Sequence, residues 1–160
     1  MEPANQLDTR PISAIDMLAV HWDGGPIIPE GYDPVEYYRT EARFHIRKDW
    51  GGGSFGYGLM YHGKIDRRGR AYLTRPFTHV AWHASLANER SVAVCVDATD
   101  GQEANDAQLA ALDRVVEEWR GMFGLRRGMV WGHGELTQYD NATTCPGPRL
   151  TAYVRAYRKG

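Results

Sequence analysis

The segment His133-Gly-Glu-Leu-Thr-Gln-Tyr-Asp-Asn-Ala-Thr-Thr-Cys-Pro-Gly147 follows a short apolar run at 129–131 and carries both an imidazole and a thiol. Because a strand holds one end of such a loop, the loop can fold back and bring both groups onto one ion. Far upstream, His21 ends another apolar run, Met17-Leu-Ala-Val20. Two histidines and one cysteine suit Zn²⁺ and leave a fourth position for water, as in catalytic zinc sites. His21, His133 and Cys145 are therefore a candidate zinc site.

Amphipathic helices are predicted on both sides of these apolar runs. Helix starts are marked by the capping box Asp33-Pro-Val-Glu36, with proline at the first helical position, and by the capping box Asn105-Asp-Ala-Gln108. Gly124 is placed to end the second helix. Apolar residues at helical spacing predict three buried stripes: Val35, Tyr38, Ala42 and Ile46; Leu109, Leu112, Val116, Trp119 and Phe123; Leu150, Tyr153, Val154 and Tyr157.

Short strands are expected at 15–20, 57–65, 71–74, 91–96 and 129–131, the second and third joined by the turn Asp66-Arg-Arg-Gly69. Strands that alternate with helices indicate an α/β fold, here a single domain with a central mixed β-sheet flanked by amphipathic helices. We expect this domain at 11–160, after a tail at 1–10. His21 and His133 each follow the carboxyl end of a strand, where open α/β sheets place ligands.

Composition indicates one soluble globular domain. The 160 residues are 42 % hydrophobic and 24 % charged, with a net charge of −1, and no apolar run approaches the length of a membrane span. So small a net charge gives no field to attract nucleic acid or an anionic membrane, and we expect a monomer that binds neither. The run Arg67-Arg68-Gly69-Arg70 favours a solvated turn, although contact with an anionic polymer stays open. The start of the chain has no secretory signal, which predicts synthesis in the cytoplasm.

The two cysteines do not form a disulfide scaffold. Cys95 lies in the apolar run Val92-Ala-Val-Cys-Val96, which favours a free, buried thiol, and a single bridge to Cys145 stays open.

Two other motifs fail on their context. Gly51-Gly-Gly-Ser-Phe-Gly56 has the glycine spacing of a dinucleotide-binding loop, but a helix precedes it and a strand follows, the reverse of what that loop requires. His79 and His83 are four residues apart, yet no glutamate of a metalloprotease motif lies between them and the run is not helical. We therefore exclude nucleotide binding and do not count His79 as a metal ligand.

Four segments in this order carry a resemblance to a known family: Leu18-Ala-Val-His-Trp22; Phe55-Gly-Tyr-Gly-Leu-Met-Tyr61; Ala81-Trp-His-Ala-Ser-Leu-Ala-Asn88; and Trp131-Gly-His-Gly-Glu-Leu136 closed by Thr143-Thr-Cys-Pro-Gly147. The chain resembles the zinc-dependent N-acetylmuramoyl-L-alanine amidases, a family that includes phage lysozyme-type amidases and peptidoglycan recognition proteins. The likeness covers about 10–158, and the fold it implies agrees with the one predicted above.

The resemblance implies roles for individual residues. His21, His133 and Cys145 match the zinc ligands, so the implied cofactor is Zn²⁺. Tyr57 matches the active-site tyrosine. Thr143 matches a position that is lysine in phage and recycling amidases and threonine in catalytic peptidoglycan recognition proteins.

Further residues are implied in substrate binding. His83 and Asn88 match a part of the family that lines the substrate groove, and Glu135 supports the ligands at most. The loop Asp23-Gly-Gly-Pro26 departs from the common family pattern, which leaves open the shape of the groove and hence the choice of substrate.

The implied reaction is hydrolysis of the amide bond between N-acetylmuramic acid and L-alanine in peptidoglycan or muropeptides. The alternative is a peptidoglycan-binding module of the same fold without catalysis. The presence of Tyr57 and Cys145 favours the enzyme. A zinc hydrolase for a different amide is a third possibility. In the cell, an endolysin that lyses the wall is favoured over a cytoplasmic recycling amidase.

Overall fold

The computed structural model describes residues 8–48, 58–139 and 141–160. Within these ranges, five strands form one mixed sheet in the order β3-β2-β4-β1-β5, in which only the β2–β3 pair is antiparallel. The elements in chain order are β1 (Met17–Trp22), α1 (Pro34–Arg47), β2 (Gly63–Ile65), β3 (Ala71–Leu73), β4 (Ser91–Val96), α2 (Asp106–Phe123), β5 (Val130–Gly132) and α3 (Pro148–Lys159). The predicted α/β class and mixed sheet are confirmed.

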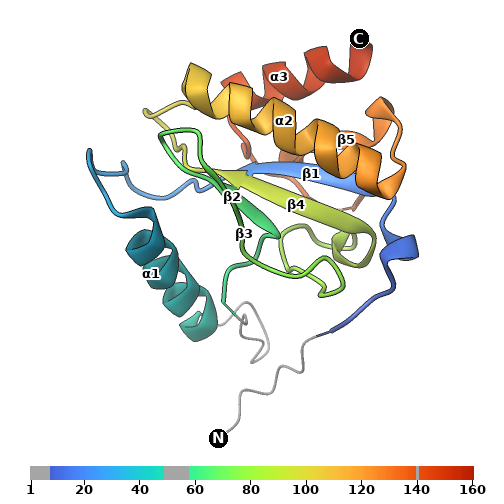
Figure 1. Ribbon diagram of the computed structural model, residues 1–160, viewed down its shortest axis with the longest axis horizontal. Helices are drawn as coiled ribbons and strands as arrows, with labels where there is room; N and C mark the ends of the chain where they lie inside the picture. The colour runs from blue at the N-terminus through green and yellow to red at the C-terminus, as the bar shows by residue number, and fades with distance from the viewer. Residues whose placement is uncertain (1–7, 49–57, 140) are drawn as a thin grey trace, which may run out of the picture.

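The central strand β1 has two buried faces with different neighbours. Leu18, Val20 and Trp22 face the main apolar core, to which α2 and α3 contribute. Met17 and Ala19 face a smaller apolar cluster on the other side. In Figure 1, α2 and α3 lie together over one side of the sheet and α1 lies on the other. His21 alternates with the core residues of β1 and therefore faces away from α2 and α3.

The predicted signals of α2 and α3 are confirmed. Asn105 and Gln108 exchange side-chain-to-backbone hydrogen bonds of 2.9 and 3.0 Å, which completes the predicted capping box. Gly124 ends α2 with φ of +65°, a conformation that glycine adopts without steric strain. The stripes pack into the core, with Leu112, Val116 and Trp119 buried in α2 and Leu150, Val154 and Tyr157 buried in α3.

The apolar stripe predicted for α1 is wrong. Val35 and Ile46 are 48 % and 44 % exposed, and of the four predicted residues only Tyr38 is buried. The cap is half confirmed, because Asp33 accepts from the amides of Val35 and Glu36. The Glu36 carboxylate instead lies 3.3 Å from Arg43, since on an exposed helix face a guanidinium one to two turns away competes for it. Polar contacts, described below, attach α1 to the sheet.

The β2–β3 hairpin has the predicted turn but a shorter first arm, since the strand begins at Gly63. Asp66 closes the turn by accepting from the backbone amides of Arg68 and Arg70, each at 2.9 Å. Both cysteines are free, so there is no Cys95–Cys145 bridge. Each helix in the described residues is too short or too polar to cross a bilayer.

Candidate metal centre

The two candidate histidine ligands come from neighbouring parallel strands. Val20 of β1 pairs with Gly132 of β5, so His21 and His133 follow at the same edge of the sheet. Their ring centroids are 4.5 Å apart. His21 is buried, and His133 begins a short 3-10 turn that holds it half-buried.

The loop after β5 brings Cys145 back to these rings. The amide of Gly134 donates to the Cys145 carbonyl at 2.7 Å. A Cβ at Gly134 would lie 2.3 Å from the carbonyl oxygen of Thr143, so this close approach requires glycine. The Cys145 Sγ lies 3.6 Å from Nδ1 of His21 and accepts from the amide of Trp22 at 3.5 Å. The loop therefore brings the thiol to the histidine pair, as predicted.

The three donor atoms lie within 4.8 Å of one another and fit a zinc ion. Burial lowers the pKa of His21 well below its usual value, and His133 and His83 lower it further. Burial also lowers the pKa of His133. Both rings are therefore neutral at pH 7, the form that binds metal. Burial raises the pKa of the Cys145 thiol to about 12, so a bound metal would have to displace its proton.

His83 contacts the candidate ligand His21. Its Nδ1 lies 3.0 Å from Nε2 of His21, and its Nε2 lies 3.0 Å from the hydroxyl of Ser91. Asn88 fixes the loop by accepting from the amides of His83 and Ala84 at 2.9 and 2.8 Å. Such a partner on the second ring nitrogen orients a metal-binding histidine. The substrate contacts predicted for His83 and Asn88 stay predictions.

Asn141 contacts the outer ring nitrogen of His133, as His83 does for His21. This role was not predicted from the sequence. Its Oδ1 lies 3.1 Å from Nε2 of His133 and accepts from the amide of Ser85 at 2.9 Å. Its Nδ2 donates to the carbonyl of Ser85 at 2.9 Å. Asn141 therefore ties the ligand loop to the loop that carries His83. Its position inside the His133–Cys145 segment was the only signal available in the sequence.

Glu135 turns away from the ligands. One carboxylate oxygen accepts from the amide of Gly132 at 3.1 Å, and the other accepts from Arg155 and Arg158 of α3, each at 2.8 Å. It fixes the turn that begins at His133 and pins that turn to α3.

The predicted active-site tyrosine, Tyr57, lies outside the described residues. Within them, Tyr61 lies beside the candidate ligand His21, with the two ring centroids 5.2 Å apart. Burial raises the pKa of Tyr61 well above its usual value, so its hydroxyl keeps its proton. Tyr61 lies in the same motif as Tyr57, four residues later, and the assignment of Tyr57 from the family resemblance stays a prediction. Thr143 is exposed beside Cys145, and its hydroxyl accepts from the Cys145 amide at 3.2 Å.

A buried ionic cluster lies next to the metal centre and was not predicted. Lys64 is fully buried and pairs with Asp23, with Glu41 at 2.8 Å and with Asp97 at 3.3 Å. Burial alone lowers the pKa of Lys64, but Asp23 and the other acidic groups hold it well above its usual value. Tyr38 of α1 donates to Asp97 at 2.9 Å. This cluster, rather than an apolar stripe, attaches α1 to the sheet.

Comparison with known proteins identifies the family of this chain. A family model described as N-acetylmuramoyl-L-alanine amidase matches residues 11–148. No curated protein matches the chain. Solved structures show the same fold at low identity, including the N-acetylmuramoyl-L-alanine amidase LysC from Clostridium intestinale URNW, with a TM-score of 0.71, 18 % identity and coverage of 98 % of this chain and 91 % of that one.

The fold is also that of peptidoglycan recognition proteins. Drosophila PGRP-SD is similar with a TM-score of 0.76 and 20 % identity, over 96 % of this chain and 86 % of that one. A complex of PGRP-LCa and PGRP-LCx with tracheal cytotoxin is similar with a TM-score of 0.70 and 21 % identity, over 97 % of this chain and 89 % of that one. Because the family model covers most of its length, the chain belongs to the N-acetylmuramoyl-L-alanine amidase family.

Proposed function

We propose that this protein hydrolyses the amide bond between the lactyl group of N-acetylmuramic acid and L-alanine, with zinc held by His21, His133 and Cys145. The convergence of these three donor atoms within 4.8 Å, in a chain of this family, carries the proposal. When bound, zinc supplies Lewis acidity that polarises the scissile carbonyl and acidifies water. The chain itself contributes orientation, since His83 and Asn141 fix the outer nitrogens of the two histidine ligands.

The test is release of muropeptides from purified cell walls by the zinc-loaded protein. Release of new N-terminal L-alanine without new reducing sugar ends identifies the amide as the bond that is cleaved. The second candidate is a binding module, favoured by the likeness to peptidoglycan recognition proteins such as PGRP-SD. Binding to walls without release, in a sample with one zinc per chain, would establish the module instead. Lysis of whole cells after membrane permeabilisation tests the endolysin role.

Tyr61→Phe is expected to lower turnover about 10²–10³-fold, the usual cost of removing one donor to a developing oxyanion. The reason is that the ring of Tyr61 contacts that of His21 and burial keeps its hydroxyl protonated, so it can act as a neutral donor to that charge. The zinc content of the variant should equal that of the wild type. The same assay on Tyr57→Phe decides between the two tyrosines. A loss confined to Tyr57→Phe would return the role to the residue that the family motif first indicated.

Thr143→Lys is expected to raise turnover about tenfold, because a charged donor binds an oxyanion roughly twice as strongly as a neutral one. Thr143 is exposed next to Cys145, so a lysine has room to extend toward the substrate. Thr144→Lys, at the neighbouring exposed position, is the matched control and should leave turnover near the wild-type value. A Thr143→Lys variant that loses activity with full zinc content would contradict the expectation.

A further inference from the structure

A chain of hydrogen bonds runs from the candidate ligand His21 through His83 and Ser91 to the carbonyl of Ala87. Nε2 of His21 lies 3.0 Å from Nδ1 of His83, and Nε2 of His83 lies 3.0 Å from the hydroxyl of Ser91. The Ser91 hydroxyl lies 2.6 Å from the Ala87 carbonyl oxygen. All four residues are buried, so the order of donors and acceptors in the chain is set inside the protein and not by solvent.

The Ala87 carbonyl sets the direction of this chain. A carbonyl oxygen only accepts, so the Ser91 hydroxyl donates its single proton to it. The Ser91 oxygen is then the acceptor for His83, which places a proton on Nε2 of His83. Burial lowers the pKa of His83 well below its usual value, so the ring is neutral and carries no second proton. Nδ1 of His83 is therefore an acceptor.

This acceptor determines which nitrogen of His21 faces the metal position. Because Nδ1 of His83 accepts, Nε2 of His21 carries the proton and donates to it at 3.0 Å. The lone pair of the neutral His21 ring is then on Nδ1, the atom that lies 3.6 Å from the thiol of Cys145. In this tautomer His21 is ready to bind a metal ion beside that thiol.

The second candidate histidine ligand is set from the same loop. The amide of Ser85 donates to Oδ1 of Asn141 at 2.9 Å, which identifies that atom as the oxygen of the side-chain amide. Nε2 of His133, 3.1 Å from this oxygen, therefore carries a proton and leaves the lone pair on Nδ1. Both rings thus have their tautomers set by groups of the segment 83–91.

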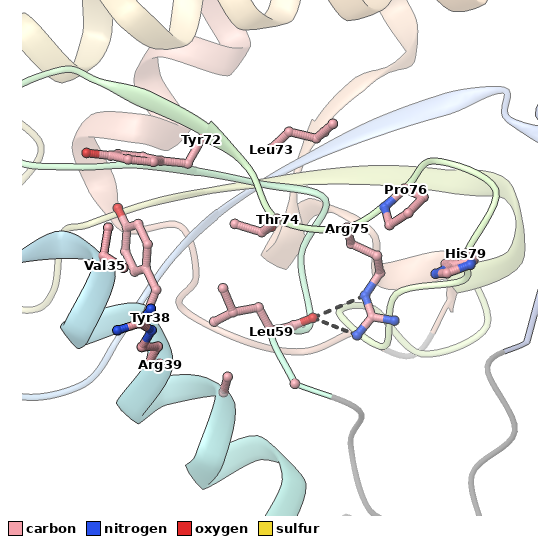
Figure 2. Close-up of a pocket in the computed structure, with 12 residues that line it drawn as sticks. Val35, Tyr38, Arg39, Leu59, Tyr72, Leu73, Thr74, Arg75, Pro76 and His79 are labelled. Atoms are coloured by element: carbon pink, nitrogen blue, oxygen red, sulfur yellow. Dashed lines mark hydrogen bonds between the residues drawn. The ribbon is translucent and has the colours of Figure 1, made fainter.

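Of the two histidines near this loop, only His83 takes part. His79, four residues earlier, lines a cavity of about 500 Å³ between α1 and β3 (Figure 2). None of the three candidate ligands lines that cavity. The signals of His79 therefore serve as an internal reference for any change at His83.

We propose that Ser91 is a positioning residue that sets the tautomer of His21 through His83. The proposal rests on the proposed metal centre and deepens it. Without the Ser91 hydroxyl, the Nε2 proton of His83 has no acceptor in a buried site, which is unfavourable. Moving that proton to Nδ1 of His83 keeps the bond between the two rings only if Nε2 of His21 becomes the acceptor. The His21 proton then occupies Nδ1, where it blocks the metal.

The experiment is nitrogen-15 NMR of the full chain labelled in histidine, because the shifts distinguish protonated, unprotonated and metal-bound ring nitrogens. We expect wild-type His21 and His83 to carry their protons on Nε2, both without zinc and with one zinc per chain. In zinc-free Ser91→Ala, a fraction of the molecules should carry these protons on Nδ1. The affinity for zinc, measured by competition with a chelator, should fall about tenfold, the lower end of the usual cost of losing an outer partner of a metal ligand.

Thr99→Val is the matched control, because it also removes a buried hydroxyl that donates to a backbone carbonyl, that of Gly25. It should leave the tautomers and the zinc affinity unchanged. Ser91→Thr keeps the hydroxyl and should retain the wild-type spectrum, which separates the hydrogen bond from a general effect of changing this position. Melting temperatures check that the variants fold.

A proton on Nδ1 of His83 in the wild type would overturn the inference without any variant, even if Ser91→Ala did not fold. Unchanged tautomers and zinc affinity in folded Ser91→Ala would overturn it too, as would an equal loss in Thr99→Val. The amidase function is tested separately. A protein that shows the expected tautomers and the weaker zinc binding of Ser91→Ala, but releases no L-alanine from cell walls, would refute the amidase function and leave this inference standing.

Discussion

Cys145→Ser is expected to lose tight zinc binding and to lower amidase turnover by at least about 10³-fold, more than the loss of a single oxyanion donor costs. Serine has nearly the size of cysteine, but its hydroxyl does not replace a thiolate as a soft zinc ligand. The loop should keep its shape, because the Gly134 amide bonds to the carbonyl of residue 145 and not to its side chain. The effect is thus on the metal rather than on the fold.

Zinc stoichiometry and melting temperature measure this directly. A ligand that binds only the folded state raises its stability in proportion to the logarithm of its concentration, so zinc should raise the melting temperature of the wild type but not of Cys145→Ser. Cys95→Ser is the matched control, since Cys95 is buried beside Lys64 and is not a proposed ligand. It should retain one zinc per chain. Full zinc occupancy of Cys145→Ser would show that His21 and His133 hold the ion with some other group.

Local signals were enough to predict that His21 and His133 come together and that three helices form. A capping box and a glycine at the end are written in neighbouring residues, so α2 was bounded correctly from Asn105 to Gly124. His21 and His133 could be paired because each follows an apolar strand, and parallel strands end at the same edge of a sheet.

Contacts that depend on how distant segments align could not be predicted from the sequence. Tyr61 lies in the segment just before β2, and His21 lies in β1. Because β4 separates β2 from β1 in the sheet, their contact depends on the pairing of strands that are distant in sequence. The contact between His133 and Asn141 depends on the path of an irregular loop. Neither contact is marked by a periodic pattern of residues that would have predicted it.

The error at α1 has a specific cause. Helical spacing of Val35, Tyr38 and Ile46 predicts a buried face, but spacing gives only the direction in which side chains point and not what lies opposite them. Opposite α1 is Lys64, which in sequence is only one polar residue in a strand. Its burial with Glu41 follows from the tertiary structure, and so the helix turns Glu41 and Tyr38 towards the sheet.

Lys64→Met is expected to destabilise the fold by about 3–5 kcal/mol, the usual cost of removing one partner from a buried ion cluster. Lys64 is fully buried, and its loss leaves Asp23, Glu41 and Asp97 together without their cation. Methionine fills most of the space, so the cost is electrostatic and not that of a cavity. For a domain of this size it corresponds to a fall of roughly 6–20 °C in melting temperature. Lys159→Met, at an exposed position, should stay within about 0.5 kcal/mol of the wild type.

The loss of folding stability in Lys64→Met should depend on pH, in a direction set by the pKa of Asp97. Burial raises the pKa of Asp97 to about 6, above its value in the unfolded chain, although Lys64 pulls it down. A raised pKa in the folded state gives a contribution to stability that is present at low pH and disappears as pH rises through that pKa. Without Lys64 the pKa rises further, so the gap between variant and wild type should widen between pH 6 and about pH 8 and be smallest near about pH 5. Urea unfolding at each pH measures it. A gap that is constant with pH, or that narrows as pH rises, would show that Lys64 acts by filling space and not by charge.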